Sequence, residues 1–431
     1  MQKVLIISYF FPPCNLTASQ RTYAWAKYLP EYGYDPIVVT RNWDVPIESG
    51  IDMSRNSGTG DELIINENVK TWYMIYRGNI RDRVYVAFGD RKGLFLRRSL
   101  SFLELVLQNF IISHLSFHNI FSKSRELLKQ DKTISKVVVS GNPFVQFQFC
   151  WRLKQEFPYI KWIADYRDDW TTSELLQNRS YLNRILHYLE QRSEQKWLSS
   201  ASCFTATTTK GEDRISGLVK IPGHVVVNGY GDEVIQRDTI LSPDKNRFVI
   251  TYNGNLYGSQ PIEFFLDAFK ALVNKYEGKI QLKLQFPGLA YDAHQEARVR
   301  NHLKGYEAYV LITPRLPMKD VLLLQDKSNV LLLVGHLKLK GIAPSKMYEY
   351  IAFRKKILLC CNDHDVLEAL LLETGLGIFA DTVKETMDVL STEIELVISG
   401  QEEKTNYNNE IVESYSRKKQ VGKLAALLDS I

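Results

Sequence analysis

Two stretches of this chain repeat one order of elements: a short apolar strand, a polar loop and a helix. The first stretch runs from a strand at residues 4–8 to a helix at residues 17–32. The second runs from a strand at residues 248–252 to a helix at residues 261–276. Strands that alternate with helices are typical of parallel sheets joined by right-handed crossovers. The sequence therefore predicts an α/β protein with two parallel sheets.

Length and turn-forming residues indicate how these sheets are divided between domains. A chain of 431 residues is too long for one hydrophobic core. Polar residues and turn formers gather between Asn228 and Asn246. We therefore predict a first domain over 1–235, a second over 246–410, and a helix within 411–431 that packs back on the first domain. Further strands are predicted at residues 36–40, 137–140, 161–165, 280–286, 330–334 and 357–361.

Composition places the chain among soluble globular proteins, with 45% hydrophobic and 24% charged residues. The five cysteines show no paired metal-binding spacing, and the eight histidines are scattered. The cysteines are therefore expected to be reduced core residues in a cytoplasmic protein, and no metal or cofactor is predicted. The N-terminus has the pattern of a short apolar strand, not of a signal peptide.

A basic segment is followed directly by an apolar run. Seven arginines and lysines lie between Arg77 and Arg98, and residues 101–115 are mostly apolar. That run is too short and too polar to predict a membrane-spanning helix. Residues 77–115 instead predict contact with an anionic membrane surface, and the alternative is a packed helix beneath a solvated basic loop. Nucleic-acid binding is not expected, because no recognition module accompanies the basic segment.

The segment 341–352 has the pattern of an anion-binding helix start after the apolar strand 330–334. Gly341 permits a tight turn and Pro344 suits the first turn of a helix. The backbone amides of Ser345 and Lys346 would then bind an anion such as a diphosphate. Glu349 lies three positions after Lys346, on the same helix edge, where a carboxylate can bind ribose hydroxyls. The alternative is a surface ion pair on an ordinary crossover helix.

Charged residues at the end of the strand 161–165 are candidates for catalysis. Arg167 is suited to pairing with a phosphate or carboxylate. Asp168 is suited to holding a sugar hydroxyl or accepting its proton. The alternative is that Arg167 and Asp168 form a structural ion pair. A second acidic pattern, Asp363-His364-Asp365, is interpreted as an ordinary loop and not as a metal site.

The first loop, residues 9–16, is expected to contact an acceptor. Its two prolines stiffen it, and Asn15 tolerates a left-handed turn. Arg21, near the start of the following helix, either reaches a phosphate of the acceptor or caps local carbonyls. The residues leave both interpretations open.

Together these segments resemble the family 4 glycosyltransferases of the GT-B fold, in particular bacterial enzymes that build capsule, O-antigen and exopolysaccharide. The resemblance covers almost the whole chain, and the order and spacing of its pieces are more specific than any one of them. The pieces are Tyr9-Phe10-Phe11-Pro12-Pro13 with Arg21, Ser140-Gly141-Asn142-Pro143, Ala164-Asp165-Tyr166-Arg167-Asp168, Val227-Asn228-Gly229-Tyr230, Tyr252-Asn253-Gly254-Asn255 and Pro344-Ser345-Lys346-Met347-Tyr348-Glu349-Tyr350.

The resemblance implies a fold and an activity. The fold would be two Rossmann-like domains with parallel sheets facing a central cleft. The activity would be a retaining, metal-independent transfer of a hexosyl-type sugar from a nucleotide-diphosphate sugar to a hydroxyl group. No cofactor is implied, because the nucleotide sugar is the substrate.

The resemblance also assigns roles to individual residues. Glu349 matches the carboxylate that binds ribose, and Ser345 and Lys346, with Pro344 before them, match the diphosphate site. Leu316 lies where the nucleobase meets backbone. The other matching positions are Gly254 and Asn255 in the loop under the phosphates, Asn142 and Asn15 with Arg21 on the acceptor side, and Arg167, Asp168 and Lys346 in the reaction.

The chain departs from the family pattern at four places. The first glutamate of the paired Glu-x7-Glu motif falls on Gly341, and a histidine of the first domain is replaced by Phe144. Asn15 and Leu16 stand where many relatives carry glycines. The basic pair that often follows the second-domain glycine loop is missing from residues 257–260. Lys346 and Arg167 remain as the main cations.

These observations predict a cytoplasmic glycosyltransferase, peripheral at the inner membrane face, that acts in surface polysaccharide assembly. Its acceptor would be a glycan or a polyprenyl-diphosphate-linked sugar. Two alternatives are a non-catalytic GT-B-like scaffold that binds a glycan or a partner transferase, and a sugar-nucleotide epimerase of similar fold.

Overall fold

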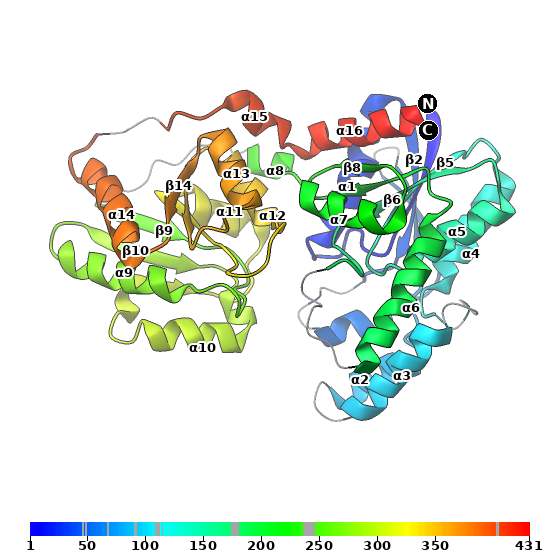
Figure 1. The fold of residues 1–431 in the computed structure, drawn as a ribbon, viewed down its shortest axis with the longest axis horizontal. Coiled ribbons are helices and arrows are strands. Elements are labelled where there is room, and N and C mark those ends of the chain that lie inside the picture. Colours follow the sequence, from blue (N-terminus) through cyan, green and yellow to red (C-terminus); the bar gives the residue numbers. More distant parts are fainter. Residues whose placement is uncertain are drawn as a thin grey trace. The chain divides into compact units, whose positions relative to one another are not determined.

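The computed structural model describes residues 1–44, 47, 50–66, 69–89, 93–107, 113, 115–173, 181–235, 246–401 and 405–431. The described chain forms two compact units, each with its own sheet and helices (Figure 1). The first unit comprises Met1–Asn228 and Gln420–Ile431, and the second comprises Gly229–Lys419. Residues 236–245 of the predicted domain boundary, and residues 90–92, 108–112 and 114 of the predicted membrane segment, lie outside the described residues.

The first unit contains an eight-stranded sheet in the order β3-β4-β2-β1-β5-β6-β7-β8. All neighbouring strands are parallel except β3 and β4, which are antiparallel at one edge. The strands are β1 (Gln2–Ser8), β2 (Tyr34–Arg41), β3 (Glu62–Asn66), β4 (Val69–Met74), β5 (Lys136–Ser140), β6 (Lys161–Tyr166), β7 (Cys203–Ala206) and β8 (Gly223–Val225).

Alternate residues of the central strand β1 enter two different cores, because successive side chains of a strand point to opposite faces. Val4 and Ile6 pack in one core, and Leu5 and Ile7 pack in the other. The sheet is therefore covered on both faces. The helices of this unit are α1 (Ala18–Tyr28), α2 (Ile80–Phe88), α3 (Leu94–Leu107), α4 (His118–Gln130), α5 (Gln146–Glu156), α6 (Tyr181–Leu198), α7 (Thr209–Val219) and most of α16 (Arg417–Ser430).

The C-terminal helix α16 belongs to the first unit although it is last in the chain. Val421, Leu424 and Leu428 of α16 lie in the same core as Val4 and Ile6 of β1. The phenol of Tyr34 also donates a hydrogen bond of 2.5 Å to Asp429. Helices α1 and α16 thus both contribute to the core on one face of the sheet.

The second unit contains six parallel strands in the order β11-β10-β9-β12-β13-β14. Numbered along the chain this is the order 3-2-1-4-5-6 of dinucleotide-binding folds, in which ligands bind where the order reverses. The strands are β9 (Arg247–Thr251), β10 (Gln281–Phe286), β11 (Val310–Ile312), β12 (Val330–Val334), β13 (Lys356–Cys360) and β14 (Gly377–Ala380). We call the point between β9 and β12 the switch point of this sheet.

Eight helices of the described residues belong to this unit: α8 (Asp232–Ile235), α9 (Glu263–Lys275), α10 (Ala293–His302), α11 (Met318–Asp326), α12 (Ser345–Ala352), α13 (Val366–Thr374), α14 (Val383–Ile398) and α15 (Asn409–Ser414). Side chains of α9 and α14 pack with β9 and β10 in one core, which includes Phe269, Leu390 and Leu284.

The predicted α/β class with two mainly parallel sheets is confirmed, and every predicted strand is present within one or two residues of its predicted ends. The predicted helix 17–32 is wrong at its end, because α1 stops at Tyr28 and a 3-10 turn, Leu29–Tyr32, follows around Pro30. Proline at that position cannot continue the hydrogen bonding of an α-helix. Six strands were not predicted: β3, β4, β7, β8, β11 and β14.

Candidate functional site

Two loops of the second unit meet at the switch point of its sheet. Residues 253–258 follow β9, and residues 335–344 lead from β12 to α12. The ammonium of Lys346 joins them, because its Nζ lies 3.4 Å from the carbonyl oxygen of Asn255 and 3.8 Å from the centre of the Tyr252 ring. We call these two loops and the first turn of α12 the Lys346 site.

Helix α12 begins at Ser345, as its predicted start requires. Pro344 precedes it in an extended conformation, and the first hydrogen bond of the turn runs from the Met347 amide to the Pro344 carbonyl at 3.0 Å. Helix geometry gives the amides of Ser345 and Lys346 no partner within the helix, so they are donors for an anion at this end.

A buried tyrosine fixes the glycine loop to this helix. Tyr350, on the side of α12 that faces the core, is fully buried. Its hydroxyl accepts a hydrogen bond of 2.7 Å from the Asn253 amide. Gly254 follows with φ of +85°, a conformation that L side chains rarely adopt. Among the described residues no heavy atom lies within 4 Å of a Cβ built on Gly254, so the loop presents open backbone.

The lysine and the glutamate of α12 have pKa values that are shifted toward neutrality. Burial lowers the pKa of Lys346 to about 7, and the carboxylate of Glu349 opposes that shift. Burial raises the pKa of Glu349 to about 7, although Arg417 acts in the opposite direction. Lys346 is partly exposed and Glu349 is 6% exposed. Within the part of the chain that the structure describes, Glu349 forms no hydrogen bond or ion pair through its carboxylate. An anion would restore the charge of Lys346.

His336 also belongs to the Lys346 site, and the sequence analysis did not include it. It is the second residue after β12, and its Nδ1 shares a hydrogen bond of 2.8 Å with the Ser259 hydroxyl. Burial and the neighbouring Lys346 lower the pKa of His336, and Asp363 raises it. A histidine next to a glycine at the end of a buried strand was the signal that could have identified it.

Leu316 lies in the loop after β11, at the same carboxyl edge of the second sheet. Its side chain is partly buried. The guanidinium of the neighbouring Arg315 lies 3.9 Å from the centre of the Tyr291 ring. Leu316 therefore lies at the carboxyl edge of the second sheet, and its contact with a nucleobase stays a prediction.

The predicted acceptor residue Arg21 is buried in an ion pair of the first unit. Its guanidinium lies 2.6 Å from Asp165, and it donates a hydrogen bond of 2.9 Å to the Val227 carbonyl. Ser140 and Thr205 donate further hydrogen bonds to the same carboxylate, at 3.1 and 2.7 Å. We call this cluster the Asp165 hub. Arg21 is 4% exposed, so the structure gives it a role in holding α1 to the sheet and no accessible face for an acceptor phosphate.

The predicted catalytic pair of the first unit adopts its alternative arrangement. Arg167 and Asp168 form an ion pair with each other at 3.0 Å. The side chain of Asp168 is 58% exposed, and that of Arg167 is 14% exposed and lies over the Phe10 ring. Both residues follow β6 at the carboxyl edge of the first sheet, so they stay accessible to a ligand, and a catalytic role remains a prediction.

The two remaining predicted acceptor residues, Asn15 and Asn142, differ in how firmly their side chains are held. The side-chain amide of Asn15 forms two hydrogen bonds with the Ile47 backbone. Its nitrogen donates to the Ile47 carbonyl at 3.2 Å, and its oxygen accepts from the Ile47 amide at 3.0 Å. Asn142 is exposed after β5 with φ of +62°. Both residues are exposed, and they differ in that the Asn15 amide is fixed by the Ile47 backbone.

A buried carboxylate supports the loop that carries Arg167 and Asp168. Glu194 of α6 accepts hydrogen bonds from the Tyr166 hydroxyl at 2.7 Å and from the Thr171 hydroxyl at 2.5 Å. Burial raises the pKa of Glu194 to about 7. This residue was not identified from the sequence, because its partners lie more than twenty positions away on another element.

Asp363 and Asp365 have structural partners, as their interpretation as an ordinary loop requires. Asp363 accepts hydrogen bonds from the amides of Asp365, Leu367 and Glu368, at the start of α13. Asp365 accepts one of 2.5 Å from the Gly341 amide. These bonds fix the turn before α12. No cluster of metal-ligating side chains is present among the residues that the structure describes.

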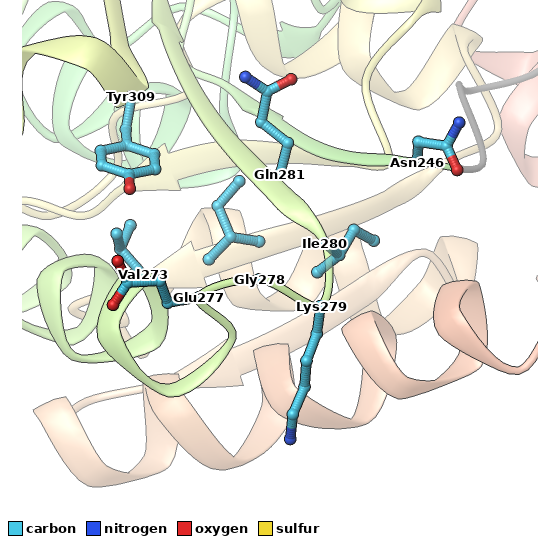
Figure 2. A pocket seen from close by; sticks show the side chains of 9 residues that line it. Asn246, Val273, Glu277, Gly278, Lys279, Ile280, Gln281 and Tyr309 are labelled. Carbon is cyan, nitrogen blue, oxygen red and sulfur yellow. The ribbon is translucent and has the colours of Figure 1, made fainter.

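Figure 2 shows the side chains that line one hollow of the second unit. Whereas the Lys346 site lies at the carboxyl edge of the sheet, this hollow lies at the amino edge. Its volume is about 390 Å³, and its lining includes Asn246, Gln281 and Tyr309, which stand at the amino ends of β9, β10 and β11. Ligands of open α/β sheets bind at the carboxyl ends of the strands. The hollow is therefore not part of the candidate site.

No protein-family model matches this sequence, and no curated protein matches it. Solved structures are similar over the full length. Sucrose-phosphate synthase from Thermosynechococcus elongatus has a TM-score of 0.62 and 12% identity, with 100% of this chain and 99% of that chain covered. The UDP-forming α,α-trehalose-phosphate synthase from Burkholderia xenovorans, in complex with glucose-6-phosphate, has a TM-score of 0.63 and 11% identity, with 99% and 100% covered.

The UDP-GlcNAc 2-epimerase from Methanocaldococcus jannaschii is also similar, with a TM-score of 0.52, 11% identity and 100% of both chains covered. At these identities the likeness establishes the fold alone. The chain has the GT-B fold, with a Rossmann-like sheet in each of its two units.

Proposed function

We propose that this protein is a metal-independent glycosyltransferase that moves a sugar from a nucleotide-diphosphate sugar to a glycan or lipid-linked acceptor. The observation that carries the proposal is the Lys346 site. It combines a helix start, an open glycine loop and a partly buried ammonium at the switch point of a dinucleotide-binding sheet. The similar synthases include one whose description names it as UDP-forming.

In this proposal the donor diphosphate lies on the amides of Ser345 and Lys346, above Gly254 and Asn255. Glu349 binds the ribose hydroxyls, and Leu316 lies beside the nucleobase. The leaving diphosphate develops negative charge, which Lys346 and the helix amides stabilise. The ammonium needs no reorganisation for this role, since it is already held beside Tyr252 and Asn255.

The stereochemistry is proposed to be retaining, with the sugar hydroxyl attacking on the face from which the nucleotide leaves. The resemblance to family 4 glycosyltransferases is the support for this step. Arg167, Asp168 and Asn142 at the carboxyl edge of the first sheet are the accessible candidates for contact with the acceptor. Asp168 is the more exposed residue of the Arg167–Asp168 ion pair, and it would accept the proton of the attacking hydroxyl.

We further propose that the acceptor is a polyprenyl-diphosphate-linked glycan in surface polysaccharide assembly at the inner membrane face. The support is a surface on α2 and α3, which pack together and are joined by an ion pair of 3.4 Å between Arg81 and Glu104. Ile80 of α2 is 68% exposed and Leu96 of α3 is 50% exposed. Arg83 of α2 and Arg98 of α3 are also exposed.

Apolar side chains flanked by arginines suit an anionic membrane surface. Among the described residues, no helix is both long enough and apolar enough to cross a bilayer. Co-sedimentation with phosphatidylglycerol and phosphatidylcholine vesicles tests this surface. We expect binding to the anionic vesicles that the Arg83→Glu, Arg98→Glu double variant loses, and equal behaviour with both lipids would contradict it.

A panel of nucleoside diphosphates tests the proposed activity. We expect at least one of UDP, GDP, ADP, CDP and dTDP to raise the melting temperature, because a ligand that binds only the folded state stabilises it by about 2.7 kcal/mol at a concentration of one hundred times its Kd. The corresponding nucleotide sugar should then be consumed only when an acceptor is present. Stabilisation by none of the five would overturn the proposal.

The specific similarity to an epimerase favours a second candidate function. An epimerase would convert a nucleotide sugar to its epimer without an acceptor, and the Lys346 site would serve it equally. Product analysis of the nucleotide sugar incubated alone separates the two functions. Conversion to an epimer would select the epimerase, and unchanged nucleotide sugar would select the transferase.

A further inference from the structure

The glycine loop after β9 lacks the basic pair that commonly follows such a loop, yet a histidine side chain reaches its end from the loop after β12. Residues 257–260 carry no charge. His336, from the loop after β12, holds Ser259 through a hydrogen bond of 2.8 Å, and the Leu337 amide donates to the Ser259 carbonyl at 3.3 Å. The ring therefore lies where the two loops of the switch point join.

We propose that His336 binds the diphosphate of the donor through Nε2 and becomes protonated when it does so. This inference rests on the proposed function, because it assigns a further binding residue to the same site. The hydrogen bond with Ser259 occupies Nδ1 and orients the ring. Within the described chain Nε2 forms no hydrogen bond, so this nitrogen is available to a ligand.

The charges around His336 determine the direction of its titration. Lys346 of α12 disfavours the imidazolium and Asp363, before α13, favours it, while burial disfavours it further. The centre of the Tyr257 ring lies 5.9 Å from the centre of the His336 ring. The pKa of His336 is therefore below its ordinary value in the ligand-free protein. A diphosphate adds negative charge and must raise it, so that binding takes up a proton from solvent.

His336→Gln tests the inference, because glutamine keeps a neutral donor of similar length and cannot become charged. The probe is the nucleoside diphosphate that gives the largest thermal shift in the panel. Its affinity is measured by isothermal titration calorimetry at about pH 6 and about pH 8, on either side of the histidine titration. A charge-assisted hydrogen bond is about twice as strong as a neutral one. We expect the variant to lose roughly tenfold in affinity at the lower pH and less than threefold at the higher pH.

His302→Gln is the matched control. It lies on α10 of the same unit, where its Nε2 is 2.8 Å from Asp267 and not at the Lys346 site. We expect this variant to bind the nucleotide as the unchanged protein does. Ser259→Ala, which removes the partner of Nδ1, should reproduce part of the His336→Gln loss.

Imidazole resonances give a readout that does not depend on affinity. In ¹⁵N-histidine-labelled protein, the His336 signal is identified by its absence from His336→Gln, and its pKa should rise on saturation with the nucleotide. An unchanged His336 pKa with bound nucleotide, or an affinity of His336→Gln equal to that of the unchanged protein at both pH values, would overturn this inference alone. Binding of no nucleotide to the unchanged protein would overturn the proposed function together with it.

Discussion

The carboxyl edges of the two sheets differ in how well their buried charged groups are compensated by partners. In the first unit Asp165 is fully buried, and Arg21, Ser140 and Thr205 supply it with an ion pair and hydrogen bonds. In the second unit Lys346 and Glu349 are desolvated with much weaker compensation, and the pKa of each lies near 7. A fully compensated charge holds elements together, and a poorly compensated one gains by binding a ligand. The Asp165 hub therefore stabilises the first unit, and the Lys346 site is the place where a ligand would supply the missing compensation.

The distribution of tryptophan makes the two edges separable in one experiment. All seven tryptophans lie in the first unit, so tryptophan fluorescence reports its unfolding and not that of the second. Ligand binding at the Lys346 site is measured independently by calorimetry. The stability of the first unit and ligand binding by the second unit can therefore be measured separately.

The largest effect is expected at the Asp165 hub. Asp165→Ala leaves the Arg21 guanidinium buried without its carboxylate, and breaking such a pair costs about 3–5 kcal/mol. Urea unfolding followed by tryptophan fluorescence measures the loss. Asp168→Ala is the control, because its ion pair with Arg167 is more exposed and should cost less than about 1 kcal/mol. Equal losses in the two variants would contradict the distinction between the hub and the exposed pair.

The next effect concerns binding and not stability. Lys346→Met removes the ammonium and keeps an apolar stem against Tyr252. We expect the affinity for the nucleoside diphosphate to fall roughly 10- to 100-fold, since a hydrogen bond to a charged group contributes about 1.5–3 kcal/mol. The tryptophan unfolding transition should not move. Lys384→Met, on the exposed face of α14, is the control and should change neither quantity.

A smaller effect, with a defined pH dependence, is expected from Glu349. Its pKa is raised from 4.5 to about 7, so the folded state holds the proton more tightly than the unfolded state. Its contribution to stability is therefore present below about pH 4.5 and is lost as the pH rises toward 7. Glu349→Gln removes this loss, and above pH 7 the second unit should gain about 3 kcal/mol relative to the unchanged protein.

Amide hydrogen exchange in α12 at several pH values measures that gain, since this helix carries Glu349. The same variant should bind ribonucleotides less well while its affinity for the 2′,3′-dideoxy analogue changes little. A variant that loses affinity for both nucleotides equally would show that Glu349 does not bind the ribose.

The smallest effect is expected from substitution of Gly254, in the loop after β9. Gly254→Ala and Gly278→Ala introduce the same strain, because both glycines have positive φ and open space around a built Cβ. Each should cost about 1 kcal/mol of stability in the second unit. Only Gly254→Ala should weaken nucleotide binding, since Gly278 lies at the amino edge of the sheet. Equal affinities of the two variants would show that no ligand approaches Gly254.

Much of the second unit could be predicted from its sequence. The strand at Val330–Val334 and the helix start at Ser345 were found at their observed positions, because a continuous apolar run and a Gly-x-x-Pro turn are local signals. Short strands were not predicted. Val310–Ile312 and Gly377–Ala380 have too few residues for a periodic pattern, and only their neighbours in the sheet make them strands.

The partners of the charged residues could not be predicted in the same way. Arg21 pairs with Asp165, which is 144 positions away in the sequence. His336 forms a hydrogen bond with Ser259, which is 77 positions away. No spacing rule connects residues so far apart, because the sheet order determines which loops meet. The sequence identified Lys346 as a cation of the site, and the structure was needed to show that it contacts Asn255 and Tyr252 and lowers the pKa of His336.

Hydrogen exchange with and without the best-binding nucleoside diphosphate tests the central claim most directly, because it locates the ligand without changing any residue. We predict that bound nucleotide slows amide exchange in residues 253–258 and 335–346, where the loops after β9 and β12 meet. Protection confined to the first unit, or to the hollow at the amino edge of the second sheet, would contradict the assignment of the Lys346 site.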